Sequence, residues 1–111
     1  MNKLENYVLG KWTPGDGDGT PLLNAVNGEL VATVSTKGLD FSEMLAYGRL
    51  NGGPALRKMT FWERGNMLKK LALYLTKRKD KFYEISYKTG ATKIDSWIDI
   101  EGGFGNLFAN A

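Results

Sequence analysis

The sequence contains neither cysteine nor histidine, and these two absences exclude several classes of catalytic and metal site. Without cysteine there is no thiol nucleophile and no disulfide, so the redox compartment cannot be inferred. Without histidine there is no imidazole base, no Ser-His-Asp triad and almost no transition-metal site. Residue chemistry alone therefore indicates that this 111-residue chain is not a complete enzyme.

Long apolar runs and a strong net charge are also lacking. No run approaches the roughly 20 residues that span a bilayer, and the N-terminus lacks the apolar stretch of a signal peptide, so we expect a cytoplasmic protein without membrane contact. A net charge of +3 is too small to indicate nucleic acid. Helical spacing puts several of the clustered cations opposite an apolar stripe, as on a solvated helix face, so we expect no nucleic-acid partner. They are Lys69, Lys70, Lys77, Arg78, Lys79 and Lys81.

The first third, residues 1–37, is expected to form a β-hairpin or meander. Short apolar stretches at residues 7–9, 22–23 and 30–34 have the composition of strands. They are separated by turn-forming residues at 14–19 and by a second turn at 24–29. Asp16-Gly17-Asp18-Gly19 has the beginning of a calcium loop, but Thr20 and Pro21 stand where further ligands are required. A hairpin turn is the better interpretation.

Residues 38–111 are expected to form about four helices. The first should end at Asn51-Gly52-Gly53-Pro54, and Gly90 should close the third. Capping boxes are indicated at the starts of the first two helices, where Glu follows Asp or Thr by three residues. The predicted caps are Asp40, Thr60, Asp80 and, for the last helix, Asp95 or Ser96. The fold class is thus α+β, with strands first and helices after them.

The last helix is unusually apolar and contains three glycines. Its large side chains need a surface to pack against; they are Trp97, Ile98, Ile100, Phe104, Leu107 and Phe108. Each glycine costs about 1 kcal/mol in a helix, which indicates close approach by another helix or, second, by a ligand. Asp95 and Asp99 share a face and could form an acid–base pair, although a cap and a surface carboxylate are commoner. We expect this chain to be a piece of a larger protein.

The order of these segments resembles the aldehyde dehydrogenase superfamily. Gly10-Lys11-Trp12 and residues 24–34 resemble its N-terminal hairpin, although Asn24-Ala25 lacks the usual proline. Residues 53–64, 89–92 and 95–103 are similar, more specifically, to the bifunctional ring-opening enzymes of phenylacetate degradation, which join an aldehyde dehydrogenase domain to a hydratase-like domain. The semialdehyde dehydrogenases of aerobic benzoate degradation share part of this similarity.

This resemblance implies one segment, residues 1–111, from the N-terminal part of an α/β aldehyde dehydrogenase domain, with a hairpin region at 1–37 and a helical region at 38–111. The implied parent oxidises a ring-opened CoA-thioester semialdehyde to the acid with NADP or NAD, and it is a homo-oligomer. The family's catalytic cysteine, general-base glutamate and nucleotide contacts lie further along the chain. The segment alone is therefore expected to hold no catalytic residue and no cofactor, and its partner is the remainder of the dehydrogenase domain.

The resemblance also implies one candidate site. The last helix of the segment would line the substrate tunnel through Ile98 and Gly102, and a glycine there would widen the tunnel for a bulky thioester. Two other functions stay open on the residues alone. One is a free-standing interaction module that binds a partner through the last helix, and the other, ranked last, is a small basic nucleic-acid-binding protein.

Overall fold

The computed structural model describes residues 2–111, which form two compact units. The first ends at Arg57 and holds two antiparallel hairpins and a helical segment; the second runs from Lys58 to Ala111 and is helical. The expected α+β class, with hairpins followed by four helical segments, is confirmed. The grouping of residues 1–111 into one segment of a larger domain stays a prediction.

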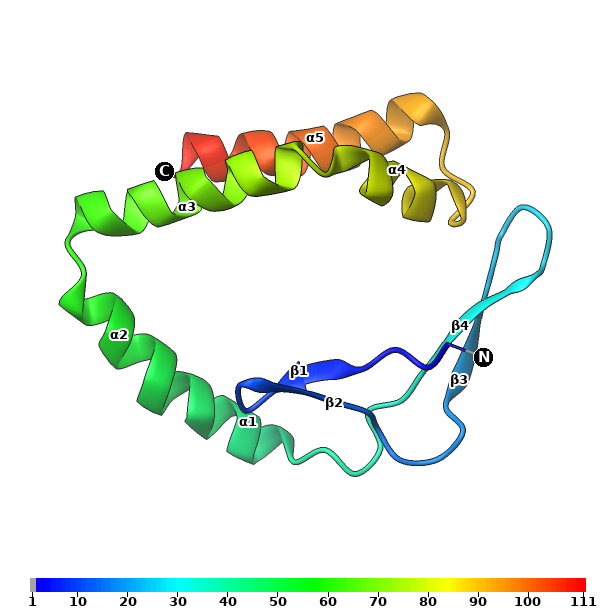
Figure 1. Cartoon of the computed structure of the whole chain (residues 1–111), viewed down its shortest axis with the longest axis horizontal. Coiled ribbons are helices and arrows are strands. Elements are labelled where there is room, and N and C mark those ends of the chain that lie inside the picture. The colour runs from blue at the N-terminus through cyan, green and yellow to red at the C-terminus, as the bar shows by residue number, and fades with distance from the viewer. Residues whose placement is uncertain (1) are drawn as a thin grey trace. The chain divides into compact units, whose positions relative to one another are not determined.

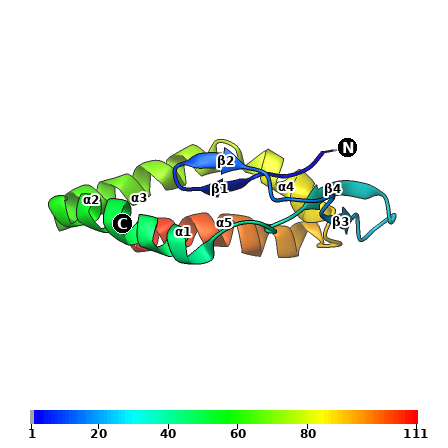
Figure 2. The same cartoon turned by 90° about the horizontal axis from the view of Figure 1, so that it is seen from below.

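The first hairpin joins β1 (Asn6–Val8) to β2 (Lys11–Thr13) (Figures 1 and 2). Leu9 and Gly10 form its turn, and both have positive φ, 52° and 80°. Such two-residue turns match the twist of the flanking strands. Residues 7–13 gave no turn signal in the sequence, because leucine rarely adopts a positive φ. The positive φ favours glycine at position 10, and a Cβ there would also lie 2.6 Å from the Tyr47 hydroxyl, so the end of the Tyr47 side chain would have to move.

The second hairpin joins β3 (Thr20–Leu23) to β4 (Leu30–Val34). The expected turn at residues 24–29 is confirmed; the Asn24 side chain accepts a hydrogen bond from the Val26 N–H at 2.9 Å. The other edge of β4 is also paired, because the Thr33 N–H donates to Asn2 and the Thr33 carbonyl accepts from Leu4. Pairing on both edges accounts for the burial of Ala32 and Thr33.

A turn is present at residues 14–19, but the hairpin-turn interpretation is wrong, because this turn links β2 to β3 and these strands belong to different two-stranded sheets. Its carbonyl groups are used internally: Lys3 donates to the carbonyls of Gly15 and Gly17, and the Ser35 hydroxyl donates to that of Asp16 at 2.7 Å. Among residues 2–111 no cluster of three or more acidic, histidine or cysteine side chains could hold a metal ion.

The helical segment of the first unit continues where a break was predicted. It consists of α1 (Phe41–Tyr47), a π-helical turn η1 (Gly48–Gly52) and α2 (Gly53–Lys58). The predicted end at residues 51–54 is therefore wrong. The Gly53 N–H bonds the Gly48 carbonyl, five residues back, so the helix widens just before Pro54. A proline ring clashes with the carbonyl four residues earlier in a regular α-helix, and the wider turn accommodates it. Asp40 caps α1 as predicted, accepting from the Glu43 N–H at 3.0 Å.

The second unit contains α3 (Phe61–Thr76), α4 (Lys79–Tyr87) and α5 (Lys93–Ala109), and α5 runs alongside the other two (Figures 1 and 2). The predicted Thr60–Glu63 capping box is present in both directions, at 3.1 and 2.7 Å. Gly90 has φ 86° and lies in the turn after α4, as expected of a helix-closing glycine.

Two predicted caps in this unit are wrong. Asp80 lies inside the first turn of α4, and the cap position is Arg78, because α4 follows α3 after a short turn. The cap of α5 is Thr92, whose hydroxyl accepts from the Asp95 N–H at 3.2 Å and donates to the Asp95 carboxylate at 2.9 Å. Thr-x-x-Asp was the sequence signal for this cap. Ser96 is instead completely buried.

The segment has very little core. Among the described residues the only hydrophobic side chains that are buried are Val8, Ala32 and Ala72. All three tryptophans are more than half exposed, at 65% for Trp12, 75% for Trp62 and 57% for Trp97. No helix within residues 2–111 has both the length and the apolar character needed to cross a membrane.

Candidate functional site

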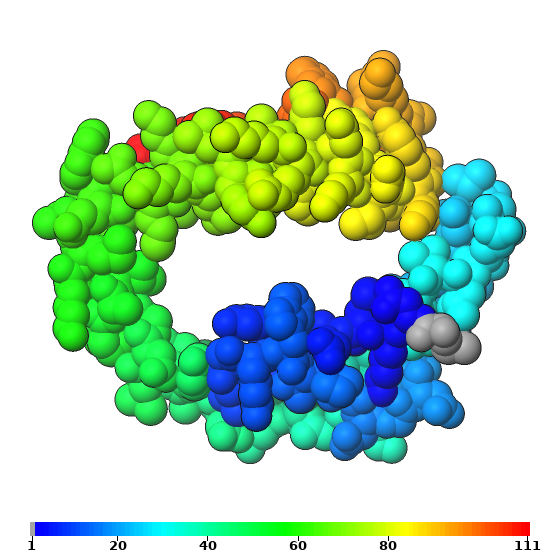
Figure 3. Space-filling model, in the orientation of Figure 1, coloured from blue at the N-terminus to red at the C-terminus, as the bar shows by residue number. Residues whose placement is uncertain are grey.

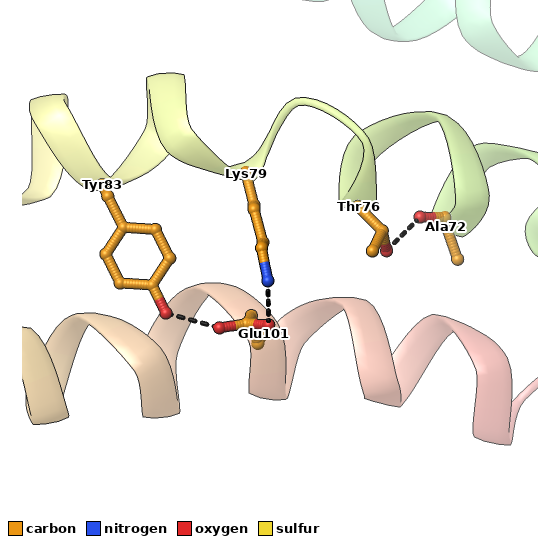
Figure 4. A network of polar contacts seen from close by, with 5 residues as sticks. All are labelled: Ala72, Thr76, Lys79, Tyr83 and Glu101. Carbon is orange, nitrogen blue, oxygen red and sulfur yellow. Dashed lines mark hydrogen bonds and ion pairs between the residues drawn. The ribbon is translucent and has the colours of Figure 1, made fainter.

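The best-defined polar site of the second unit joins α4 to α5 (Figure 4). Lys79 and Tyr83 lie four residues apart on α4, so they share a helix face. Both contact the Glu101 carboxylate on α5: the Tyr83 hydroxyl donates to Oε2 at 2.5 Å, and the Lys79 ammonium lies 3.2 Å from Oε1. One carboxylate thus fixes the register of the two helices.

These contacts shift the pKa values of two groups. The hydrogen bond to Glu101 raises the pKa of Tyr83 to about 12, because the phenol must stay protonated to donate. The same bond, and after it the one from Lys79, lowers the pKa of Glu101 below its ordinary value. Glu101 is therefore ionised at neutral pH and acts as an acceptor. A tyrosine that titrates so high does not serve as a base near neutrality.

The first prediction concerns pH. The raised pKa of Tyr83 contributes stability that is present below about pH 10 and lost as the pH rises toward about 12. The lowered pKa of Glu101 contributes stability that is present above about pH 4.5 and lost as the pH falls. We expect Glu101→Gln to return the pKa of Tyr83 toward 10. In a plot of melting temperature against pH, the variant should show a smaller decrease than the wild type at both high and low pH.

The measurement is an ultraviolet phenolate titration of the wild type, of Glu101→Gln and of Tyr83→Phe, which identifies the late-titrating tyrosine among the five. Asp99→Asn, which removes a charge from the same helix without touching the network, is the control. A late-titrating tyrosine that persists in Glu101→Gln would contradict the assignment.

Small buried groups hold the three helices together. The Ser86 and Ser96 hydroxyls lie 2.8 Å apart and satisfy each other where α4 crosses α5. The rings of Phe82 and Phe104 meet edge to face at 5.8 Å, and Ala72 on α3 is fully buried. Small residues at such positions permit close helix approach.

A groove opens between α4 and the first turns of α5, with a volume of about 640 Å³. In the space-filling view α3 and α4 cover most of α5, whose first turns project beside α4 (Figure 3). The groove is lined by aromatic, aliphatic and charged side chains: Lys79, Asp80, Tyr83, Glu84, Tyr87, Lys93, Ile94, Trp97 and Glu101.

The two sequence-predicted site residues lie on α5 outside this groove. Ile98 is 60% exposed, and a Cβ built on Gly102 would meet no atom within 4 Å. Gly103 and Gly105 are equally open, so the expected close packing of another helix on these glycines is wrong for the described residues. Asp95 belongs to the Thr92 cap, and Asp99 is exposed, which fits the structural interpretation of these carboxylates.

The sequence did not indicate the Lys79–Tyr83–Glu101 network. Glu101 is one of several carboxylates in the last helix, and no neighbouring residue in the sequence marks it as a link between helices. Its partners lie 18 and 22 residues away, and no local pattern specifies which side chains face each other across two helices. The i, i+4 spacing of Lys79 and Tyr83 was the one available signal.

Comparison with known proteins adds one match. No protein-family description matches the chain. The chain is 38% identical over 101 residues to a protein named 3,4-dehydroadipyl-CoA semialdehyde dehydrogenase from Aromatoleum evansii. The match suggests a segment related to the aldehyde dehydrogenases. It covers 90% of this chain and 20% of the relative, so the chain spans about one fifth of the relative's length.

Proposed function

We propose that this chain forms the N-terminal part of an NADP- or NAD-dependent aldehyde dehydrogenase that oxidises a CoA-linked semialdehyde to the acid. The observation that carries this proposal is the similarity over nine tenths of the chain to a protein whose name specifies such a substrate. The expected location is the cytoplasm, and the expected assembly is a homo-oligomer.

The surface of the segment supports the proposal. Large apolar side chains lie uncovered on both units, including all three tryptophans. Exposed apolar side chains in such number favour a partner surface that covers some of them. The remainder of the dehydrogenase domain is the partner that we propose.

The residues described here do not fit a nicotinamide site. A dinucleotide fingerprint requires glycines in a turn between a strand and a helix. Gly102, Gly103 and Gly105 lie well inside α5, and helix continues on both sides of them. The cofactor, which accepts hydride in this class of reaction, would be bound by other parts of the enzyme. The role we assign to this segment is to form one wall of the substrate channel with Ile98 and Gly102.

Two substrates deserve direct comparison. The relative's name favours 3,4-dehydroadipyl-CoA semialdehyde. The resemblance of residues 53–64 and 95–103 favours the ring-opened CoA semialdehyde of phenylacetate degradation. The test is to express the complete reading frame that contains this segment and to follow reduction of NADP and NAD with each substrate. If the complete protein oxidises neither substrate, the proposal is rejected.

A free-standing interaction module is the alternative, and the same uncovered apolar surface favours it. The reading frame separates the two functions. Coding sequence that continues past codon 111 to a cysteine-containing loop supports the dehydrogenase, whereas an immediate stop codon supports the module.

The second prediction is that the isolated 111-residue chain oxidises no aldehyde with either nicotinamide cofactor. Covalent aldehyde oxidation requires a thiolate that forms a thiohemiacetal, and the chain contains no cysteine. The measurement is cofactor reduction by the purified chain against a mock purification from empty-vector cells. Turnover above that control would refute the proposal that the catalytic residues lie outside this segment.

A further inference from the structure

The groove between α4 and α5 has walls that suit a flat cationic group. Tyr83 and Tyr87 line it from α4, with ring centroids 6.0 Å apart and ring planes tilted by 51°. Ile94 and Trp97 line it from α5, and they are 70% and 57% exposed. The faces of aromatic rings carry negative charge and attract cations.

The charges that line the groove favour the same occupant. Lys79 and Glu101, which both line the groove, form an ion pair, and these two charges neutralise each other. Asp80 and Glu84 lie one helical turn apart on α4, a spacing at which like charges repel. Neither carboxylate has an ion pair or hydrogen bond to any described residue. Lys93 is the one other cation in the lining, so the groove carries one net negative charge.

We propose that this groove binds an arginine side chain presented by a polypeptide segment. The guanidinium stacks against Trp97 and the two tyrosines and donates hydrogen bonds to Asp80 and Glu84. Arginine suits the groove better than lysine does, because its planar group stacks on rings, is weakly hydrated and donates two parallel hydrogen bonds. The same unit already contains such a contact, with the Arg78 guanidinium carbon 3.5 Å from the Tyr74 ring centroid.

The source of the arginine rests on the proposed function: the remainder of the dehydrogenase, about four fifths of the matched relative, supplies the covering segment. The chemistry of the groove does not depend on that source. A positive result for the groove together with an inactive complete protein would therefore reject the proposed function alone.

The test is a titration of the isotope-labelled 111-residue chain carrying Phe61→Ser and Trp62→Ser, which should reduce self-association and lie outside this groove, followed by amide and indole NMR signals. The probes are the N-acetyl, N-methylamide derivatives of arginine, lysine and glutamate. We expect saturable shifts of the Trp97 indole and of the Tyr83 and Tyr87 amides with the arginine derivative, smaller ones with lysine and none with glutamate. Asp80→Asn with Glu84→Gln should weaken arginine binding about fivefold, the scale of exposed ion pairs.

The control variant combines Glu5→Gln with Asp99→Asn, which removes the same charge outside the groove and should leave arginine binding unchanged. Three outcomes overturn the proposal. They are no saturable shift with arginine, equal shifts with the glutamate derivative, and equal weakening by the groove and control variants. Dispersed signals in both variants establish that they remain folded.

Discussion

The purified 111-residue chain is expected to self-associate, with a mass by sedimentation that increases with concentration. Its accessible surface is 8526 Å² for 12.3 kDa. A compact monomer of that mass exposes about 6,100 Å², and two separate folded units of half the mass expose about 7,400 Å² together. The excess over even two separate units reflects side chains that no element of this chain covers. Such surfaces associate in water.

One uncovered patch is specific enough to test. Phe61 and Trp62 on the first turn of α3 line a second groove of about 320 Å³ together with Phe108 at the end of α5. We expect Phe61→Ser with Trp62→Ser to reduce both the association and the binding of a hydrophobic dye. Lys69→Ser, which changes a polar residue that lines the same groove, is the control. A monodisperse wild-type monomer with little dye binding and a cooperative melt would contradict the prediction.

Gly102→Met in the complete enzyme is expected to lower kcat/KM for a CoA-linked semialdehyde about tenfold or more while sparing a small free aldehyde. Ile98 and Gly102 share a face of α5, and the space beside Gly102 is open within the described residues. The proposed channel would use that space for the thioester. A misfit of one methylene in an apolar pocket costs about 1–3 kcal/mol of transition-state binding, and the larger methionine side chain should cost at least as much, which gives this magnitude.

The isolated chain provides a second readout for the same substitution. Because nothing packs on Gly102 in this segment, methionine there should raise helix stability by several tenths of a kcal/mol through its better propensity. Gly103→Met gives the same gain in helix propensity but lies on another face of α5. It therefore serves as the control for effects on the substrate channel. If another part of the enzyme packs on Gly102, overpacking would instead cost about 1–3 kcal/mol and lower the activity toward both aldehydes. Equal losses on both substrates with a lower melting temperature would defeat the channel role.

The sequence determined those features that depend on residues close together in the chain. Asp40 and Thr60 are caps because a side-chain oxygen reaches an N–H three residues on, and that geometry is local. The turn at residues 24–29 follows from Asn24 and Gly28. The cap of the last helix is Thr92 and neither Asp95 nor Ser96. The Thr92 hydroxyl is hydrogen-bonded to Asp95, and the Ser96 hydroxyl is paired with that of Ser86.

Contacts between side chains far apart in the sequence depend on how the helices pack. The π-helical turn before Pro54 lets the helix continue through Gly52, Gly53 and Pro54, which usually end a helix. The wider backbone removes the clash that the proline ring would otherwise cause. Glu101 became the link between α4 and α5 because helix packing brings Lys79 and Tyr83 to it, and packing angles are not encoded in local spacing. The sequence shows that α5 is rich in apolar residues. Whether Ile94, Trp97 and Ile98 are buried depends on which other helices pack against them, and no element in the described part of the chain covers them fully.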